Sequence, residues 1–141
     1  MSYKASRYTK RGNATKQGES AFSNRLKVEL RKAFPTSKWW KNHGTEYSER
    51  GMSDLMGVVD GKLIALEVKI NNGWFSPLQV KFLRDINLAG GNGLGILKND
   101  SDVYLIPVSA MGRKGNRHRE LWHKINYPDD LSTIEFFGDY E

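Results

Sequence analysis

The chain has 141 residues, of which 38% are hydrophobic and none is cysteine, and its formal net charge at pH 7 is +6. This length suits one domain with a core of its own, and the lack of cysteine excludes disulfides and thiolate metal sites. No apolar run approaches the ~18 residues of a membrane span and the first residues start no secretory signal, so we expect a cytoplasmic protein without membrane contact. The positive charge favours a polyanionic partner.

The first eighteen residues are basic and polar and contain no acid. This composition predicts a flexible basic arm over residues 1–18, in which Lys10 and Arg11 are candidate phosphate contacts. A tail that only increases solubility would have the same composition.

A helical period begins at Glu19. Apolar residues recur on one stripe until Pro35 ends the helix: Phe22, Leu26, Leu30 and Phe34. Glu19 lies one turn before this stripe, so its carboxylate can face the interior. A glutamate at this position also suits the dipole of the helix without any further role.

Residues 38–42 read as a strand whose two tryptophans pack in the core or against a second subunit. The polar loop from His43 to Arg50 follows and leads directly to Asp54. Its position makes His43 and Arg50 candidate substrate contacts, although a lone histidine is more often structural.

Residues 51–69 contain two short apolar runs joined by Asp60-Gly61, which predicts a hairpin with a two-residue turn. Counting outward from this turn, Asp54 lies opposite Glu67, with their Cβ atoms ~5 Å apart. Because side chains alternate along a strand, Lys69 shares the face of Glu67 at a distance of ~6.5 Å, and the even-numbered residues between 64 and 70 point into the core.

Two opposed carboxylates destabilise a sheet, so their pairing needs a reason. A divalent cation between them is one, since Mg²⁺ prefers hard oxygen ligands, few of them carboxylates. The alternative is a solvated hairpin in which Glu67 and Lys69 form an incidental surface pair. Glutamate and lysine are depleted in strands, which weighs against that alternative.

A second helix is predicted to begin at Ser76-Pro77, with serine as N-cap and proline at the first position, and to end before Gly90. Gln79 lies in its first turn, near the end of the strand that carries Lys69. We expect the buried stripe of this helix to be formed by Leu78, Phe82, Leu83 and Ile86.

Residues 93–97 and 103–106 read as two further strands joined through Asn99-Asp100. A leading helix, two strands, a helix and two more strands predict an α/β fold with a mixed central sheet and helices on its faces.

The segment 111–124 is a second basic cluster, and its candidate phosphate contacts are Arg113, Lys114, Arg117 and Arg119. A solvated loop is the alternative, and a short helix is expected behind it, at residues 120–125. Residues 127–141 contain acids but no lysine or arginine, which predicts an acidic C-terminal tail.

Several motifs together resemble one group of nucleases. They are His43-Gly44, Ser53-Asp54-Leu55, Glu67-Val68-Lys69, Ser76-Pro77-Leu78-Gln79 and Ala89-Gly90-Gly91. This set resembles the PD-(D/E)xK superfamily, with Ser53 where its name has proline, and within it the virus-type replication-repair (VRR-NUC) branch. The resemblance covers roughly residues 19–97.

The resemblance implies a restriction-endonuclease-like domain over residues 19–126. It also implies that Mg²⁺, or Mn²⁺ in its place, is bound by Asp54, Glu67, the Val68 carbonyl and a glutamate of the first helix. Glu19 is the best match for that glutamate, with Glu29 as the second choice. Lys69 would orient or deprotonate the attacking water or neutralise charge, and Gln79 would support the site.

The implied activity is DNA endonuclease cleavage that leaves 5′-phosphate and 3′-hydroxyl ends. Small stand-alone, phage-like members resemble dimeric Holliday junction resolvases, so branched DNA and a homodimer are expected, in the cytoplasm of a bacterial host if the chain is phage-encoded. The alternatives are a flap- or sequence-specific nuclease, an RNA-directed nuclease, and a non-catalytic DNA-binding module with the same fold.

Overall fold

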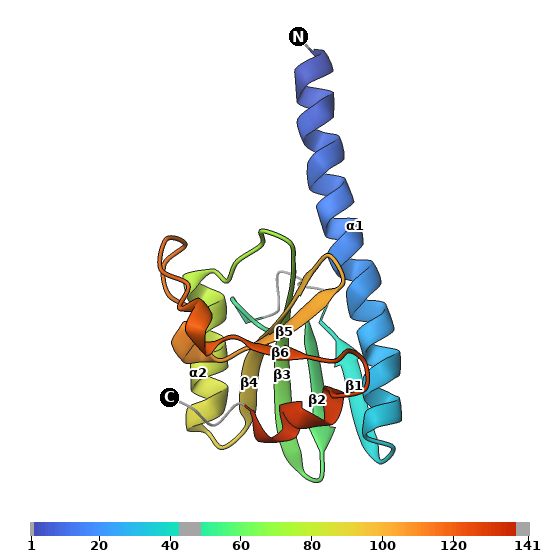
Figure 1. Cartoon of the computed structure of the whole chain (residues 1–141), viewed down its shortest axis with the longest axis vertical. Coiled ribbons are helices and arrows are strands. Elements are labelled where there is room, and N and C mark those ends of the chain that lie inside the picture. The colour runs from blue at the N-terminus through green and yellow to red at the C-terminus, as the bar shows by residue number, and fades with distance from the viewer. Residues whose placement is uncertain (1, 43–48, 138–141) are drawn as a thin grey trace.

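A mixed six-stranded sheet in the order β1-β2-β3-β4-β5-β6 forms the centre of the computed structural model (Figure 1). The structure describes residues 2–42 and 49–137, with side chains from residue 18 onward. The strands are β1 (Ser37–Lys41), β2 (Leu55–Val59), β3 (Lys62–Ile70), β4 (Asn92–Asn99), β5 (Asp102–Ile106) and β6 (His123–Ile125). Helices α1 (Ser2–Ala33) and α2 (Pro77–Leu88) each pack against the sheet, in two separate hydrophobic clusters. This arrangement confirms the predicted α/β fold.

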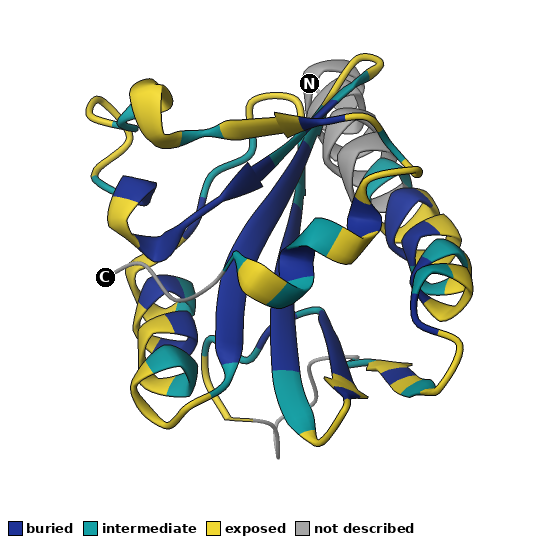
Figure 2. Cartoon of the chain, turned by 60° about the horizontal axis from the view of Figure 1, so that its bottom comes forward, coloured by how far each residue is buried: buried dark blue, intermediate teal, exposed yellow. Residues whose placement is uncertain are grey.

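The hairpin of β2 and β3 has the predicted register, with Val59 opposite Lys62 and Leu55 opposite Leu66. Asp60 and Gly61 both have positive φ angles, 51° and 77°, as a two-residue hairpin turn of type I′ requires. β3 also pairs in parallel with β4, and both of its faces are buried (Figure 2). The prediction that only its even-numbered residues face a core was therefore incomplete, because Ala65 and Leu63 belong to the hydrophobic cluster that contains α2.

Helix α1 buries the predicted stripe, since Phe22, Leu26 and Leu30 are fully buried against the sheet. The helix begins at Ser2, however, and not at Glu19, and its N-terminal part extends beyond the sheet (Figure 1). The segment predicted as a flexible arm therefore has a helical backbone. The change of composition at residue 18 does not end the helix, because no proline lies between Ser2 and Ala33 and the lysine, arginine, glutamine and alanine residues before it are good helix formers.

Three 3₁₀ helices connect the remaining elements in the described part of the chain: η1 (Val108–Ala110), η2 (Arg119–Leu121) and η3 (Leu131–Phe136). The helix predicted at residues 120–125 is wrong, because the chain forms only the single turn of η2 before it continues as β6. No helix in the described part of the chain is long and apolar enough to cross a membrane.

The predicted acidic tail is partly folded. Leu131 and Ile134 of η3 are fully buried in the same cluster as α1, and Asn92 Nδ2 donates to the carbonyls of Ile134 and Glu135 at 3.3 and 2.6 Å. The folded unit therefore continues past the predicted boundary at residue 126 and reaches Phe137. Apolar residues spaced three apart within the acidic segment pack against the core and so attach this segment to the domain.

Candidate active site

Asp54 and Glu67 meet at the open end of the hairpin. Asp54 directly precedes β2, and its carbonyl accepts a hydrogen bond of 2.8 Å from the Asn42 amide, which fixes the backbone there. The register of the hairpin, continued by one pair, places it opposite Glu67. Asp54 Oδ2 also accepts from the Val68 amide at 3.4 Å, so this carboxylate lies across the end of β3.

Glu67 is only 1% exposed and lies among three polar groups. Its Oε2 accepts from Gln79 Nε2 at 3.0 Å and lies 3.6 Å from Lys69 Nζ. Its Oε1 is buried and has no hydrogen-bond partner among the described residues. Because buried polar atoms in native proteins are almost always satisfied, this oxygen needs an explanation.

Burial first, and next the negative charge of Asp54, raise the pKa of Glu67 to about 9, against the ammonium of Lys69, which lowers it. Without a cation, Glu67 is therefore mostly protonated at neutral pH. A cation bound at Oε1 would change that balance in favour of the carboxylate.

Glu19 is the glutamate of α1 that lies near this pair. Its pKa is raised by burial, lowered by Lys69 and raised by Asp54, so both charges lie within its electrostatic range. A Cβ built on Gly73 would lie 3.5 Å from Glu19 Oε2 and 3.5 Å from the Lys69 Cδ, which places both side chains at the turn after β3. Glu29 instead pairs with Lys32 at 3.6 Å.

Gln79 is held in one orientation by the start of α2. Ser76 Oγ accepts from the Gln79 amide at 3.2 Å, and Gln79 Oε1 accepts from the Ser76 amide at 2.9 Å, which forms the reciprocal capping box. The amide nitrogen of the Gln79 side chain is then left to donate to Glu67. The predicted N-cap is therefore confirmed. The predicted buried stripe is wrong at one position, because Leu78 is 47% exposed and Val80 is buried instead, on the face of α2 that meets the sheet.

The loop before Asp54 packs against the same helix turn. Gly51 has φ +78°, and a Cβ there would overlap the carbonyl oxygen of Leu78. Only glycine lets the backbone at residue 51 lie this close to the first turn of α2. This close contact keeps the loop that leads to Asp54 beside the helix turn that carries Gln79. Ser53 is fully buried, and its hydroxyl has no partner in the described part of the chain.

The donor atoms at this site suit a hard divalent cation. Among residues 2–42 and 49–137, no three acidic, histidine or cysteine side chains form a metal-binding group. The available donors are the carboxylates of Asp54 and Glu67 and the carbonyl of Val68, which points to the same side of β3 as the Val68 amide and so toward Asp54. Mg²⁺ is commonly held by one or two carboxylates, with water and phosphate oxygens completing its shell.

The predicted phosphate contacts fall into two groups. Arg113 and Lys114 are exposed, and so is Arg50. Arg117 instead lies over the Trp74 ring at 4.6 Å and Arg119 over the Trp122 ring at 4.9 Å, so both hold the loop to the domain. The side chains of Lys10 and Arg11, and all of His43, lie outside the described residues, and their DNA contacts stay predictions.

An aromatic cluster behind the site was not singled out from the sequence. Trp74 and Trp122 stack with their ring centroids 5.5 Å apart, and Trp74 Nε1 donates to the Gly112 carbonyl at 2.9 Å. This cluster joins the turn after β3 to the basic loop. The adjacent Trp74-Phe75 pair was the available signal, but nothing in the sequence places Trp122 beside it.

No family model and no curated protein matches the chain. Among solved structures, it is similar to Hjc, a Holliday junction resolvase from the archaeal hyperthermophile Archaeoglobus fulgidus, with a TM-score of 0.54 and 22% sequence identity. The match covers 84% of this chain and 93% of that one. The fold of this chain is therefore the restriction-endonuclease-like α/β fold that Hjc also has.

Proposed function

We propose that this protein is a metal-dependent endonuclease that hydrolyses phosphodiester bonds in branched DNA. The observation that carries the proposal is the pairing of Asp54 with the buried Glu67, whose Oε1 has no partner among the described residues, beside Lys69. The likeness to a Holliday junction resolvase supports the choice of branched DNA. The VRR-NUC branch remains our proposal for the closer relationship.

Asp54, Glu67 and the Val68 carbonyl would hold Mg²⁺, for which Mn²⁺ would substitute. The bound metal supplies Lewis acidity, which lowers the pKa of a coordinated water and stabilises negative charge on the phosphate. Glu19, whose carboxyl group is within electrostatic range of Lys69 and Asp54, would bind a water of the metal shell or a second ion. Gln79 keeps Glu67 Oε2 in place, which would leave Oε1 available to a cation.

Lys69 would act on the substrate. Its Nζ lies 3.6 Å from Glu67 Oε2 and 5.9 Å from the centroid of the Phe75 ring, and its side chain is only 13% exposed. An ammonium held this way donates a hydrogen bond to the attacking water or to a phosphate oxygen, and so favours the transition state in which negative charge builds up.

Labelled substrates test the proposal: a four-way junction, a flap, a plain duplex and a single strand of DNA, and the corresponding RNA duplex. Each is incubated with the protein in Mg²⁺, Mn²⁺ and EDTA, and the products are separated on denaturing gels. We expect cleavage of the junction in either metal, none in EDTA, and products with 5′-phosphate ends. Failure to cut any substrate in both metals, or equal cutting in EDTA, would overturn the proposal.

A further inference from the structure

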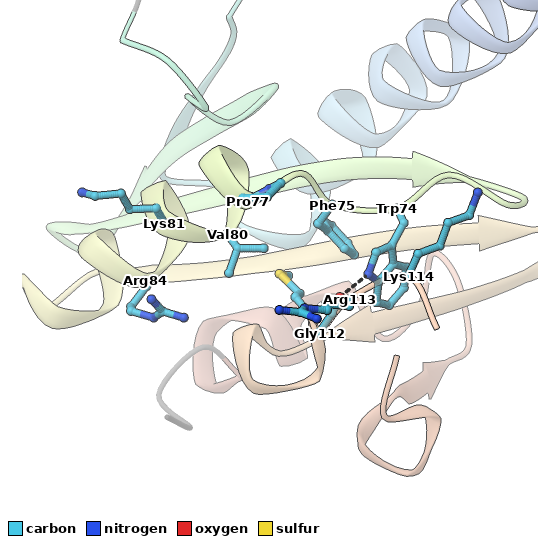
Figure 3. A pocket seen from close by; sticks show the side chains of 10 residues that line it. Trp74, Phe75, Pro77, Val80, Lys81, Arg84, Gly112, Arg113 and Lys114 are labelled. Carbon is cyan, nitrogen blue, oxygen red and sulfur yellow. Dashed lines mark hydrogen bonds between the residues drawn. The ribbon is translucent and has the colours of Figure 1, made fainter. Parts of the chain in front are cut away.

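A cavity of about 620 Å³ lies between α2 and the loop that follows η1, next to the candidate active site (Figure 3). Its floor is apolar and its rim is cationic. The apolar residues are Trp74, Phe75, Pro77, Val80 and Met111, and the cations are Lys81, Arg84, Arg113 and Lys114. Its volume is within the range of ~300–1,000 Å³ that is typical of small-molecule sites.

Three cations of the rim are not neutralised by the described part of the protein. Lys81 pairs with Asp85 at 2.7 Å, but Arg84, Arg113 and Lys114 have no ion pair with any described residue. Unpaired cations around an apolar floor match a ligand that combines a hydrophobic ring with negative charge. A nucleotide has both parts, whereas an acidic peptide lacks the ring and an aliphatic chain lacks the charge.

The cavity shares a wall with the candidate active site. Pro77 and Val80 lie on both sides of Gln79, which binds Glu67. Phe75 belongs to the floor of the cavity, and its ring also lies over the ammonium of Lys69. A strand that is cut beside Lys69 would therefore place a neighbouring nucleotide at this opening.

The wall of the cavity is held in place before any ligand arrives. Trp74 is fixed by its hydrogen bond to the Gly112 carbonyl, by stacking on Trp122 and by the guanidinium of Arg117. Trp74 is therefore a fixed part of the cavity wall where the loop meets it, and the contact surface for a flat ring is the floor of Phe75, Val80 and Met111.

We propose that this cavity receives one unpaired nucleotide of the substrate strand, with its base on the apolar floor and its phosphates on Arg84, Arg113 and Lys114. This inference rests on the proposed nuclease function and adds a subsite to it. The base must be unpaired, because a base within a duplex cannot leave its stack without a cost. The protein would thus prefer DNA in which a nucleotide next to the cut is not paired, as at a branch point or a flap.

The test compares two fluorescein-labelled oligonucleotides of equal length and charge, oligo(dA) and an oligomer in which every residue is an abasic tetrahydrofuran nucleotide. Affinity is measured by fluorescence anisotropy in EDTA, so that no cleavage occurs. We expect the wild-type protein to bind oligo(dA) roughly tenfold more tightly than the abasic oligomer, since base stacking on side chains contributes this much. Val80→Phe fills the cavity and should reduce this ratio to near one.

Two further variants keep the test independent of misfolding. Leu88→Phe enlarges an exposed residue of the same helix outside the cavity and should keep the wild-type ratio. The surface double variant Arg84→Ala/Arg113→Ala should weaken binding of both oligomers, whereas Arg31→Ala/Lys38→Ala, which removes the same charge elsewhere, should weaken it much less.

A wild-type ratio near one, or a ratio that Val80→Phe leaves unchanged in a protein with an unaltered melting curve, would overturn the inference. If Val80→Phe does not fold, the charge variants decide instead. Equal loss of oligonucleotide affinity in Arg84→Ala/Arg113→Ala and in Arg31→Ala/Lys38→Ala would then overturn the inference. Cleavage of the junction in Mg²⁺ is scored separately. Lost base preference with intact cleavage contradicts only the subsite, and intact base preference without cleavage contradicts the nuclease.

Discussion

Glu67 is the residue at which stability and the proposed chemistry oppose each other. A carboxyl group that is 1% exposed, lies beside Asp54 and has one unsatisfied oxygen destabilises the fold when it ionises. Nothing in the packing of the described residues requires an acid there, because Glu67 shares its face of β3 with Ala65, which is fully buried and apolar. A role in binding a cation explains why a carboxyl group occupies this position.

The pH dependence of stability follows from this burial. The folded pKa of Glu67 is about 9 and lies above its ordinary value of 4.5, so between these pH values the folded state holds a proton that the unfolded state has lost. Stability in EDTA should therefore fall as pH rises from about 4.5 to about 9. Urea unfolding at several pH values measures this, and Glu67→Gln should flatten the dependence. An identical pH dependence in Glu67→Gln would show that the carboxyl group is not protonated in the fold.

Lys69 tests the division of roles within the site. If its ammonium acts on water or phosphate, Lys69→Ala should lose cleavage by a factor of ~100 or more and still bind Mn²⁺. Isothermal titration calorimetry of the variant with Mn²⁺ measures the second property, with Lys38→Ala as a control that removes an exposed lysine. Complete loss of Mn²⁺ binding would mean that Lys69 mainly maintains the structure of the site.

The first turn of α2 is the element that joins fold and site, because the same Gln79 side chain closes the capping box and binds Glu67. Ser76→Ala removes the cap alone and should cost about 1 kcal/mol of stability, with cleavage within about twofold of the wild-type rate. Gln79→Ala removes both interactions and should reduce cleavage much more. Thermal melts and cleavage rates of the two variants separate these effects, and equal cleavage by both would contradict a positioning role for Gln79.

The sequence predicted those elements whose cause is local. Asp60-Gly61 set the register that brings Asp54 opposite Glu67, and Ser76-Pro77 set the start of α2. The sequence did not predict the elements that form only through contacts with residues far away in the chain. β6 forms because it pairs with β5, and residues 127–137 fold because Leu131 packs in the hydrophobic cluster that contains α1.

The same distinction applies to the site. The pairing of the two carboxylates and Lys69 follows from hairpin geometry, so spacing alone predicted it. Arg117 was interpreted as a phosphate contact because it belongs to a basic loop, but the ring that it covers, Trp74, comes from a distant part of the chain. No local pattern shows that Arg84 of α2 lines the same cavity as Arg113.

At the scale of the whole molecule, one domain contains one candidate site, whereas a four-way junction is resolved by two cuts. We therefore predict a homodimer with two-fold symmetry, which matches the symmetry of the junction. Sedimentation velocity at micromolar concentration should give twice the mass of 16.1 kDa. A strict monomer that cuts flaps better than junctions would contradict resolution of junctions but not cleavage itself.

The proposed role of Glu67 in a metal-dependent nuclease site is decided by the cleavage rate of one variant. The initial rate of junction cleavage in Mg²⁺ is compared for Glu67→Gln and for Glu120→Gln, which makes the same chemical change at an exposed glutamate. We predict that Glu67→Gln reduces the rate by a factor of ~100 or more at unchanged DNA affinity in EDTA, as does Asp54→Asn, and that Glu120→Gln retains the wild-type rate. Cleavage by Glu67→Gln at the wild-type rate would contradict the account.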